Sequence, residues 1–222
     1  MTSRVTAIVP MRHSSERVKG KNYRPLGGKP LFRHIVDALL ASESVAQVVI
    51  DTDSPVIIEH AKANLPEVMV LERPKHLRDG AIAMNDVLEN TLSQIDGEFF
   101  LQTHSTNPFL RSGTIDHAVK YFFNKGVDSL FTATPMQARF WRDSEHPVNH
   151  DPAVLLRTQD LKPLYLENSC LYIFRRGPFL SERNRITKKR AIYPMSALEA
   201  IDIDTEEDWD IAAALMEHLL DS

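Results

Sequence analysis

The sequence is poor in cysteine and in long apolar runs. Its 222 residues include one cysteine, Cys170, which excludes an internal disulfide and favours a reducing compartment. Only a five-residue apolar run precedes Arg12, too short for the core of a signal peptide. Nowhere do about 18 apolar residues run together, as a membrane span requires. We therefore expect a cytoplasmic protein with no membrane partner.

A marked excess of either charge is also missing. The chain has 26 Lys and Arg against 30 Asp and Glu, a formal net charge of −4. This balance gives no electrostatic reason to expect a nucleic-acid partner, so any anionic ligand must be held by a local cluster of cations. The 8 glycines form neither a Walker loop nor a dinucleotide-binding fingerprint. The familiar glycine-based nucleotide sites are therefore excluded.

What the chain does have is the composition of an ordinary globular protein, in a length that suits one domain over residues 1–222. Hydrophobic patterning predicts strands at 6–10, 45–50, 68–71, 98–102, 127–133, 169–174 and 191–194. It predicts helices at 31–41, 54–63, 84–95, 112–124 and 205–220. Regular alternation implies crossover connections, so we expect an α/β fold in which helices cover both faces of a mainly parallel sheet.

Residues 135–166 break this regularity. They show no clean period of 2 or 3.6 and contain four prolines together with Phe140 and Trp141. A long irregular insertion in a compact domain is usually functional, as a lid or an interface. Because aromatic residues are enriched in interface cores, we expect this excursion to contact a second copy of the chain.

The loop after the first predicted strand is rich in cations. It carries Arg12, Arg17, Lys19 and Lys21, with Ser14 and Ser15 between them. Guanidinium and ammonium groups make charge-assisted hydrogen bonds to phosphate oxygens, and hydroxyls and loop N–H groups add neutral donors. The loop therefore suits a polyphosphate, although a solvated basic loop would have the same composition.

Asp202 and Asp204 form the second chemical signal. In the alternating sequence 201–204, an extended backbone sends Ile201 and Ile203 to one face and both carboxylates to the other. Two close carboxylates suit Mg²⁺, which commonly takes one or two of them plus substrate phosphates. Alternatively, Asp204 or Thr205 caps the last helix, which would explain one of these residues but not the pair.

In an open parallel sheet the ligand crevice lies at the carboxyl ends of the strands. Residues just past the predicted strands are therefore expected to converge. These are Arg12, Asp51, Arg73, Gln102 with His104, and the Asp202 and Asp204 pair.

Two motifs give the chain a family resemblance. The spacing Arg-x-x-Ser-x-x-x-x-x-Lys-Asn over residues 12–22 is followed by Leu-Gly-Gly-Lys-Pro-Leu over 26–31, and the Asp pair lies in Ile-Asp-Ile-Asp-Thr-Glu-Glu-Asp over 201–208. In this order they resemble the acylneuraminate (CMP-sialic-acid-type) cytidylyltransferases, a family of sugar nucleotidyltransferases. The resemblance implies a three-layer, Rossmann-like nucleotidyltransferase fold, a homodimer formed by the 135–166 excursion, and Mg²⁺. It implies a reaction that joins an acidic 2-keto sugar to CMP from CTP and releases pyrophosphate.

The resemblance also assigns site residues. Those expected at the nucleotide are Arg12, Ser15, Arg17, Lys21, Asn22, Arg78 and Asp79. Those expected to be catalytic are Arg12, Lys21, Asp202 and Asp204, the last two as metal ligands. Those expected at the sugar are Gln102, His104, Asn168 and Tyr172. Counting back from Pro108 places His104 at the family's substrate-binding glutamine, residue identity nominates Gln102, and both can face the sugar because they are two apart on a strand. Alternatives stay open, because Arg78 and Asp79 could form a surface salt bridge and Tyr172 could simply fill a core strand.

Two departures from the family pattern bear on activity and substrate. Glu16 stands where most members have a lysine, and residues 184–186, Asn-Arg-Ile, stand where bacterial sialic acid enzymes have paired phenylalanines. We expect a sugar pocket more polar or open than one built for an N-acetyl group, and N-acetylneuraminate as a poor substrate. Alternative functions are a CMP-Kdo type enzyme, a metal-dependent glycosyltransferase and a catalytically inactive nucleotide-binding domain.

Overall fold

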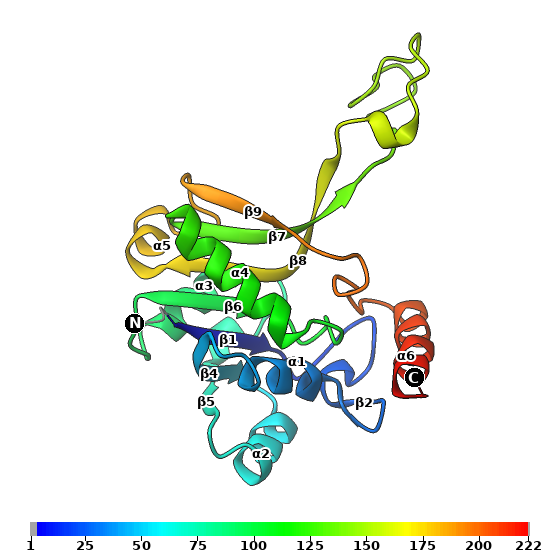
Figure 1. The fold of residues 1–222 in the computed structure, drawn as a ribbon. Helices are drawn as coiled ribbons and strands as arrows, with labels where there is room; N and C mark the ends of the chain where they lie inside the picture. The colour runs from blue at the N-terminus through cyan, green and yellow to red at the C-terminus, as the bar shows by residue number, and fades with distance from the viewer. Residues whose placement is uncertain (1–3, 222) are drawn as a thin grey trace.

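The computed structural model describes residues 4–221 as an α/β fold (Figure 1). In this part of the chain, seven strands form one sheet in the order β5-β4-β1-β6-β8-β7-β9, and β2 pairs with β3 in a separate hairpin. The strands are β1 Val5–Met11, β2 Pro25–Leu26, β3 Lys29–Pro30, β4 Val45–Thr52, β5 Met69–Glu72, β6 Phe99–Thr103, β7 Ser129–Met136, β8 Leu164–Arg175 and β9 Arg190–Pro194. Only β8 runs against its neighbours in the large sheet, which confirms the predicted mainly parallel arrangement.

Helices cover both faces of the sheet, so the predicted three layers are confirmed. They are α1 Leu31–Leu40, α2 Pro55–Asn64, α3 Met84–Leu92, α4 Ser112–Lys125, α5 Arg176–Glu182 and α6 Glu206–Asp221. Side chains alternate along β1, so Ala7 and Val9 pack with α1, α2 and α4 whereas Ile8 packs with α3 and α5. Helix α5 and the short hairpin were not predicted from the sequence, and α3 ends three residues before the predicted boundary.

A third apolar cluster attaches α6 to the beginning of the chain. Trp209 and Met216 of α6 pack with Val18, Leu26 and Ile203. The turn of the β2–β3 hairpin contributes Gly27 at φ +53, where a Cβ atom would lie 2.5 Å from a carbon of Met216. Glycine is therefore required both by the backbone conformation and by the close approach of α6. This packing places the segment before α6 beside the cationic loop.

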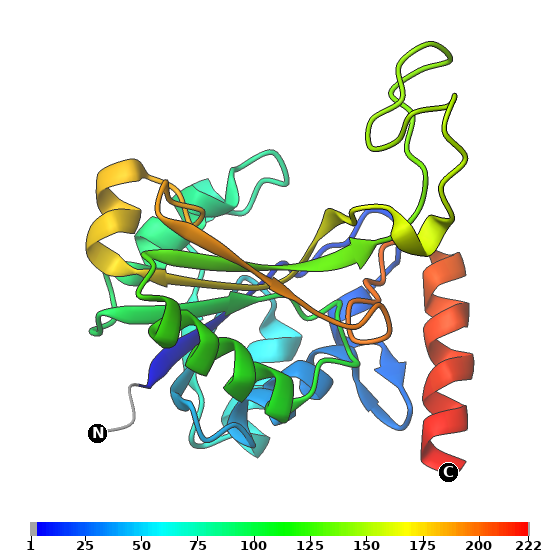
Figure 2. The same ribbon diagram turned by 45° about the horizontal axis from the view of Figure 1, so that its top comes forward.

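The 135–166 excursion is an arm that projects from the sheet (Figures 1 and 2). Its base is a two-stranded ribbon, because β7 and β8 remain paired out to Met136 opposite Leu164. The expectation of irregular structure is therefore wrong at both ends of the excursion, and it holds for the tip at 137–163, which has one short 3₁₀ turn at Thr158–Asp160. No helix within residues 4–221 has the length and apolar character needed to cross a membrane.

Candidate active site

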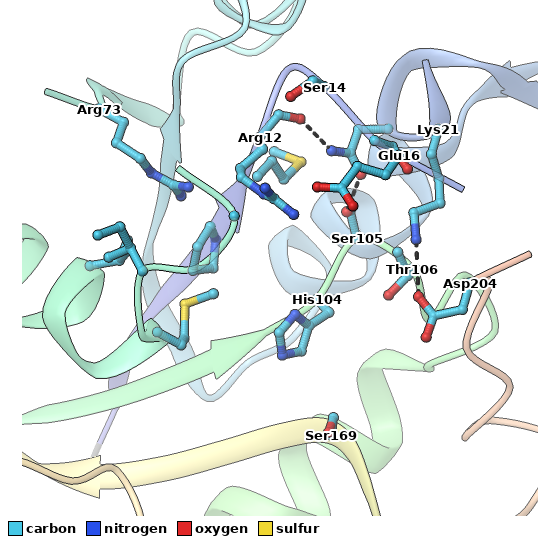
Figure 3. Close-up of a pocket in the computed structure, with 18 of the residues that line it drawn as sticks. Arg12, Ser14, Glu16, Lys21, Arg73, His104, Ser105, Thr106, Ser169 and Asp204 are labelled. Carbon is cyan, nitrogen blue, oxygen red and sulfur yellow. Dashed lines mark hydrogen bonds and ion pairs between the residues drawn. The ribbon is translucent and has the colours of Figure 1, made fainter. Parts of the chain in front are cut away.

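A cavity of about 450 Å³ opens at the carboxyl edge of the sheet. Arg12 enters it from the end of β1, Arg73 from the end of β5, and His104 from the end of β6 (Figure 3). Asp202 and Asp204 reach it from the segment before α6. Residues that follow distant strands therefore meet in one cavity, as predicted. Of the residues expected there, only Asp51 and Gln102 do not line the cavity, because both are buried in the protein.

The cationic loop is held to the sheet through Asn22. The side-chain amide of Asn22 donates to the carbonyl oxygen of Arg12 at 2.7 Å, and its oxygen accepts from the hydroxyl of Ser105 at 2.7 Å. Both ends of this buried amide are thus used by the protein. Asn22 lines the cavity, and its hydrogen bonds make it a residue that positions the loop against the end of β6.

Contacts across more than 180 residues join the loop to the acidic pair. The ammonium group of Lys21 donates to the carbonyl oxygen of Ile203 at 2.6 Å and to Asp204 Oδ1 at 3.2 Å. The guanidinium of Arg17 lies 2.8 Å from the same Asp204 oxygen. The predicted phosphate loop and the predicted metal pair are therefore parts of one site (Figure 3).

Asp202 has the features of a cation ligand. Its Oδ1 atom is buried, and among the described residues it has no hydrogen-bond partner. Burial and the neighbouring Asp204 raise the pKa of Asp202, against a hydrogen bond with Thr106 that lowers it. A buried carboxylate oxygen without a partner is costly unless a cation or donor meets it. The chain therefore fits the predicted Mg²⁺ at Asp202 and Asp204.

The protein alone would not complete such a metal site. Within residues 4–221, no group of three or more His, Cys, Asp and Glu side chains could hold a metal ion. This set of donors suits Mg²⁺, which keeps several waters and takes the rest of its ligands from substrate phosphates.

The capping alternative is resolved in favour of Thr205. Its hydroxyl accepts from the N–H of Asp208 at 3.2 Å, and the Asp208 carboxylate accepts in return from the N–H of Thr205 at 2.8 Å. This reciprocal pair is a capping box with Asp in the place of Glu. The side chain of Asp204 does not cap the helix. It forms ion pairs with Arg17 and Lys21 and lines the cavity.

Arg12 lies against a glycine that the sequence analysis did not single out. A Cβ atom built on Gly80 would overlap Arg12 Nη1. The backbone at Gly80 therefore forms one wall of the space occupied by this guanidinium. Ser15 and Asp79 also line the cavity, with Ser15 accepting from the N–H of Val18 at 3.4 Å and Asp79 accepting from the N–H of Ala81 at 2.8 Å.

Arg78 is held outside the cavity lining. Its guanidinium donates to the carbonyl oxygen of Arg73 at 2.8 Å and to the exposed carboxylate of Glu72 at 3.1 Å. This is the surface ion pair that the sequence left open as an alternative, with Glu72 rather than Asp79 as the partner. Arg73, in contrast, is buried beside the cavity and pairs with Asp51 at 2.5 Å.

The residues expected at the sugar fall into two groups. His104 lines the cavity, while Gln102 and Tyr172 are fully buried beneath Arg185. The guanidinium of Arg185 lies 3.6 Å from the centre of the Tyr172 ring and donates to Gln102 Oε1. Gln102 and Tyr172 therefore support Arg185, and Arg185 is the side chain of the three that faces the cavity.

Asn168 lies at a bulge in β8. Its side-chain oxygen accepts from the hydroxyl of Thr132 at 2.7 Å and from the backbone N–H of Cys170 at 3.2 Å. Its side-chain nitrogen donates to the hydroxyl of Thr134 at 3.1 Å. The bulge places Ser169 at φ +56, a conformation that favours glycine. Asn168 lines an adjoining hollow of about 370 Å³ that shares Ser169 and Asp202 with the main cavity.

Sequence reasoning missed several residues of the lining, among them Ser105, Thr106 and Ser169. Ser105 and Thr106 follow His104 just past the end of β6, so the strand-end rule finds them if it is extended by two residues. Ser169 gave no local signal, because its exposure to the cavity depends on the bulge between β7 and β8.

Comparisons with known proteins show which family the chain matches. A family model described as "Cytidylyltransferase" matches residues 6–221. The N-acylneuraminate cytidylyltransferase of Streptococcus agalactiae is 28% identical over 211 residues, which are 91% of this chain and 51% of that protein. This chain thus spans about half the length of that relative. The CMP-N,N'-diacetyllegionaminic acid synthase of Legionella pneumophila is 29% identical over 228 residues, covering 96% of this chain and 97% of that protein.

Among solved structures, CMP:2-keto-3-deoxy-manno-octonic acid synthetase complexed with CTP superposes with a TM-score of 0.71 at 15% identity. The match covers 97% of this chain and 99% of that one, so the two share a fold, and the Rossmann-like nucleotidyltransferase fold implied by the resemblance is confirmed. The family match extends from β1 to the end of α6 and so includes both the cationic loop and the Asp pair. The chain that builds this cavity therefore belongs to the cytidylyltransferase family.

Proposed function

We propose that the protein joins an acidic 2-keto sugar to CMP from CTP and releases pyrophosphate. The observation that carries this proposal is the direct contact of Lys21 and Arg17 with Asp204, because it brings cations suited to phosphate and a carboxylate suited to a metal together in one cavity. In phosphoryl-type transfer, charge neutralisation and positioning of the reactants supply most of the catalysis. A site of this composition supplies both.

Each part of the cavity has a role in this proposal. Arg12, Arg17 and Lys21 hold the triphosphate, Ser15 adds a neutral donor, and Asn22 keeps the loop in place. Mg²⁺ on Asp202 and Asp204 would neutralise phosphate charge and polarise the attacking hydroxyl. His104 is a poor general base, because burial and the nearby Arg185 lower its pKa to about 4. The site therefore acts by orientation and charge, without a dedicated base.

The sugar class is proposed from the names of the relatives and from the lining of the cavity. One relative is named for N-acylneuraminate and the other for N,N'-diacetyllegionaminic acid, and both names denote acidic sugars. Arg185 and His104 make one end of this cavity polar. We propose a nine-carbon or eight-carbon 2-keto acid as the substrate, with N-acetylneuraminate a weak one.

The test is pyrophosphate release from CTP and Mg²⁺ across neuraminate, legionaminate-type, deaminated nonulosonate and Kdo sugars. Asp202→Asn and Asp204→Asn should each lower turnover at least a hundredfold, since each loses a carboxylate from a site with few other protein ligands. Asp210→Asn, on the exposed side of α6, is the matched control and should keep the parental rate. Parental turnover in the Asp202 and Asp204 variants would refute the metal assignment.

Other outcomes discriminate between the alternative functions. Transfer of a sugar from a nucleotide sugar to an acceptor, with no pyrophosphate formed, would indicate a metal-dependent glycosyltransferase. CTP binding without turnover on any sugar would indicate a nucleotide-binding domain, and this is the result expected if Glu16 at the cavity disables the phosphate loop. Strong preference for N-acetylneuraminate would contradict the proposed polar pocket.

We also propose that the protein is a homodimer in which the arm contacts the second copy. The arm exposes large apolar side chains that the rest of the described chain leaves uncovered. They are Trp141, Val148, Val154, Leu155, Leu156, Leu164, Tyr165 and Leu166. Apolar surface gathered on a projecting element is typical of an interaction site. Sedimentation as a monomer at micromolar concentration would count against the dimer.

A further inference from the structure

The segment that carries Asp202 and Asp204 has no regular secondary structure of its own. It belongs to residues 195–205, which connect β9 to α6 and contain neither helix nor strand. Side chains that share a metal ion nevertheless have to stay within about 0.5 Å of the productive geometry. The contacts that hold this connection in place are therefore part of how the site is built.

The loop after β6 fixes the backbone on both sides of Asp202. The side-chain amide of Asn107 donates to the carbonyl oxygen of Ile201 at 3.1 Å. The N–H of Ile203 donates to the carbonyl oxygen of Thr106 at 2.9 Å. Asn107 and Ile203 are both fully buried. Asp202 thus lies between two residues whose backbone groups are bonded to the same loop.

Glu199 attaches this connection to helix α4. Its carboxylate accepts from the N–H of Arg111 at 3.2 Å and from the hydroxyl of Thr114 at 3.0 Å, at the beginning of the helix. The first N–H groups of a helix have no partner within it, and the side chain of Arg111, the N-cap residue, caps none of them. An anionic group is favoured at this end of a helix. Glu199 therefore caps α4 from a position 88 residues further along the chain.

We propose that Glu199 is a positioning residue for the metal pair Asp202 and Asp204. This inference rests on the proposed function and deepens it. Glu199 does not line the cavity, so it acts through the backbone. Its carboxylate holds the connection to α4, and Asn107 holds the backbone again at Ile201, directly before Asp202. The pair is thereby held in position before a ligand enters.

The test measures the affinity for Mn²⁺, as a probe for Mg²⁺, by calorimetry in the presence of CTP and without sugar, so that no turnover is involved. Glu199→Ala should weaken Mn²⁺ binding about tenfold, the lower end of the range for groups that orient metal ligands. Glu199→Gln should keep nearly the parental affinity. Its amide oxygen can accept from the N–H of Arg111 while its amide nitrogen donates to the hydroxyl of Thr114.

Asp116→Ala is the matched control. Asp116 is a carboxylate on the same helix, and it also accepts from a backbone N–H and a hydroxyl, those of Ser44 at 3.0 Å and Ser42 at 2.5 Å. These contacts join α4 to the turn between α1 and β4, and none of the three residues lines the cavity. Asp116→Ala should lower the free energy of unfolding, as Glu199→Ala does, and keep the parental Mn²⁺ affinity.

A second measurement needs no metal. Hydrogen exchange of the Ile203 amide, followed by NMR in the metal-free protein, reports the bond from this N–H to Thr106. Glu199→Ala should speed this exchange more than the exchange of Ile8 in the central strand β1, which reports global opening. Asp116→Ala should not speed the exchange of Ile203 relative to that of Ile8.

Thr114→Val covers the case in which Glu199→Ala does not fold. It removes one of the two donors from the helix side, so it should weaken Mn²⁺ binding in the same direction but less. An unchanged affinity in Thr114→Val would then overturn the inference.

The outcomes separate this inference from the proposed function. Parental Mn²⁺ affinity in Glu199→Ala, or an equal loss in Asp116→Ala, would overturn the inference. A loss in Glu199→Gln as large as in Glu199→Ala would also overturn it, because the charge of Glu199 and not its contacts would then be responsible. No Mn²⁺ binding by the parent with CTP would refute both the proposed metal site and this inference. Mn²⁺ binding that depends on Glu199, without pyrophosphate release on any sugar acid, would support the inference and refute the proposed function.

Discussion

Acidification should destabilise the fold through His104, and the size of the effect follows from its surroundings. Burial and the positive charges of Arg185 and Lys21 lower the pKa of His104 from 6.5 to about 4, against an opposing influence from Asp204. Between these two values the unfolded chain binds a proton that the folded chain does not. The free energy of unfolding therefore falls as the pH falls through this window.

The expected loss can be worked out for a convenient pair of pH values. At pH 5.0 the unfolded histidine is almost fully protonated and the folded one almost fully neutral, so the difference amounts to about 1.5 pH units, or about 2 kcal/mol. At pH 7.5 both states are neutral and the contribution vanishes. His104→Gln removes the titration, and its amide oxygen can still accept from Gln102.

The assay is urea unfolding of the parent and of His104→Gln at pH 7.5 and at pH 5.0. The parent should lose about 2 kcal/mol more than the variant between the two pH values. His34 and His60, whose pKa values are also lowered, are present in both proteins and cancel in this difference. Equal pH dependence in parent and variant would refute a neutral, buried His104 in the folded protein.

Three further predictions concern other parts of the chain. Gly80→Ala should displace the Arg12 guanidinium and raise the KM for CTP several-fold, whereas Gly113→Ala, where a Cβ atom meets nothing within 4 Å, should leave it unchanged; equal KM values would show that Gly80 does not fix Arg12 at the nucleotide. Ser169→Gly should raise the free energy of unfolding slightly in thermal or urea denaturation, because relief of the left-handed backbone, about 1–2 kcal/mol, exceeds the loss of the hydrogen bond from the Tyr172 hydroxyl at 3.1 Å; a lower stability would show that this hydrogen bond outweighs the strain. Leu155→Asp, at an arm position 88% exposed, should convert a sedimenting dimer into a monomer, and an intact dimer would place the interface elsewhere.

The parts of the fold that could be predicted from the sequence are those whose apolar and polar residues follow a local periodic pattern. The alternation in residues 201–204 and the apolar run of β1 each specify their own conformation, and the strand-end rule then brings them to one edge of the sheet. The helix α5 could not be found this way, because its seven residues include Gly177 and Pro178 and bury only Phe179.

Long-range pairing explains the other differences. The ribbon at the base of the arm forms because Met136 meets Leu164, and no local pattern in either segment specifies that partner. Likewise Gln102 and His104 were expected to share a face because they are two residues apart, yet His104 lies past the end of β6 and Gln102 lies beneath Arg185. The loop that carries Arg185 packs over Gln102 and keeps that side chain out of the cavity. This loop lies 83 residues further along the chain, so no local pattern around Gln102 specifies the contact.

The contact between Lys21 and Asp204 bears on the order in which the site can form during synthesis. The cationic loop leaves the ribosome early, but its acidic partner and the α6 residues that pack on Val18 are made about 180 residues later. A nascent chain that ends before residue 201 can build the strands from β1 to β9, yet it lacks the carboxylates and the apolar cover that hold the loop. The proposed capacity to bind CTP with metal should therefore arise in one late step, once the segment of Asp202 and Asp204 and helix α6 have emerged.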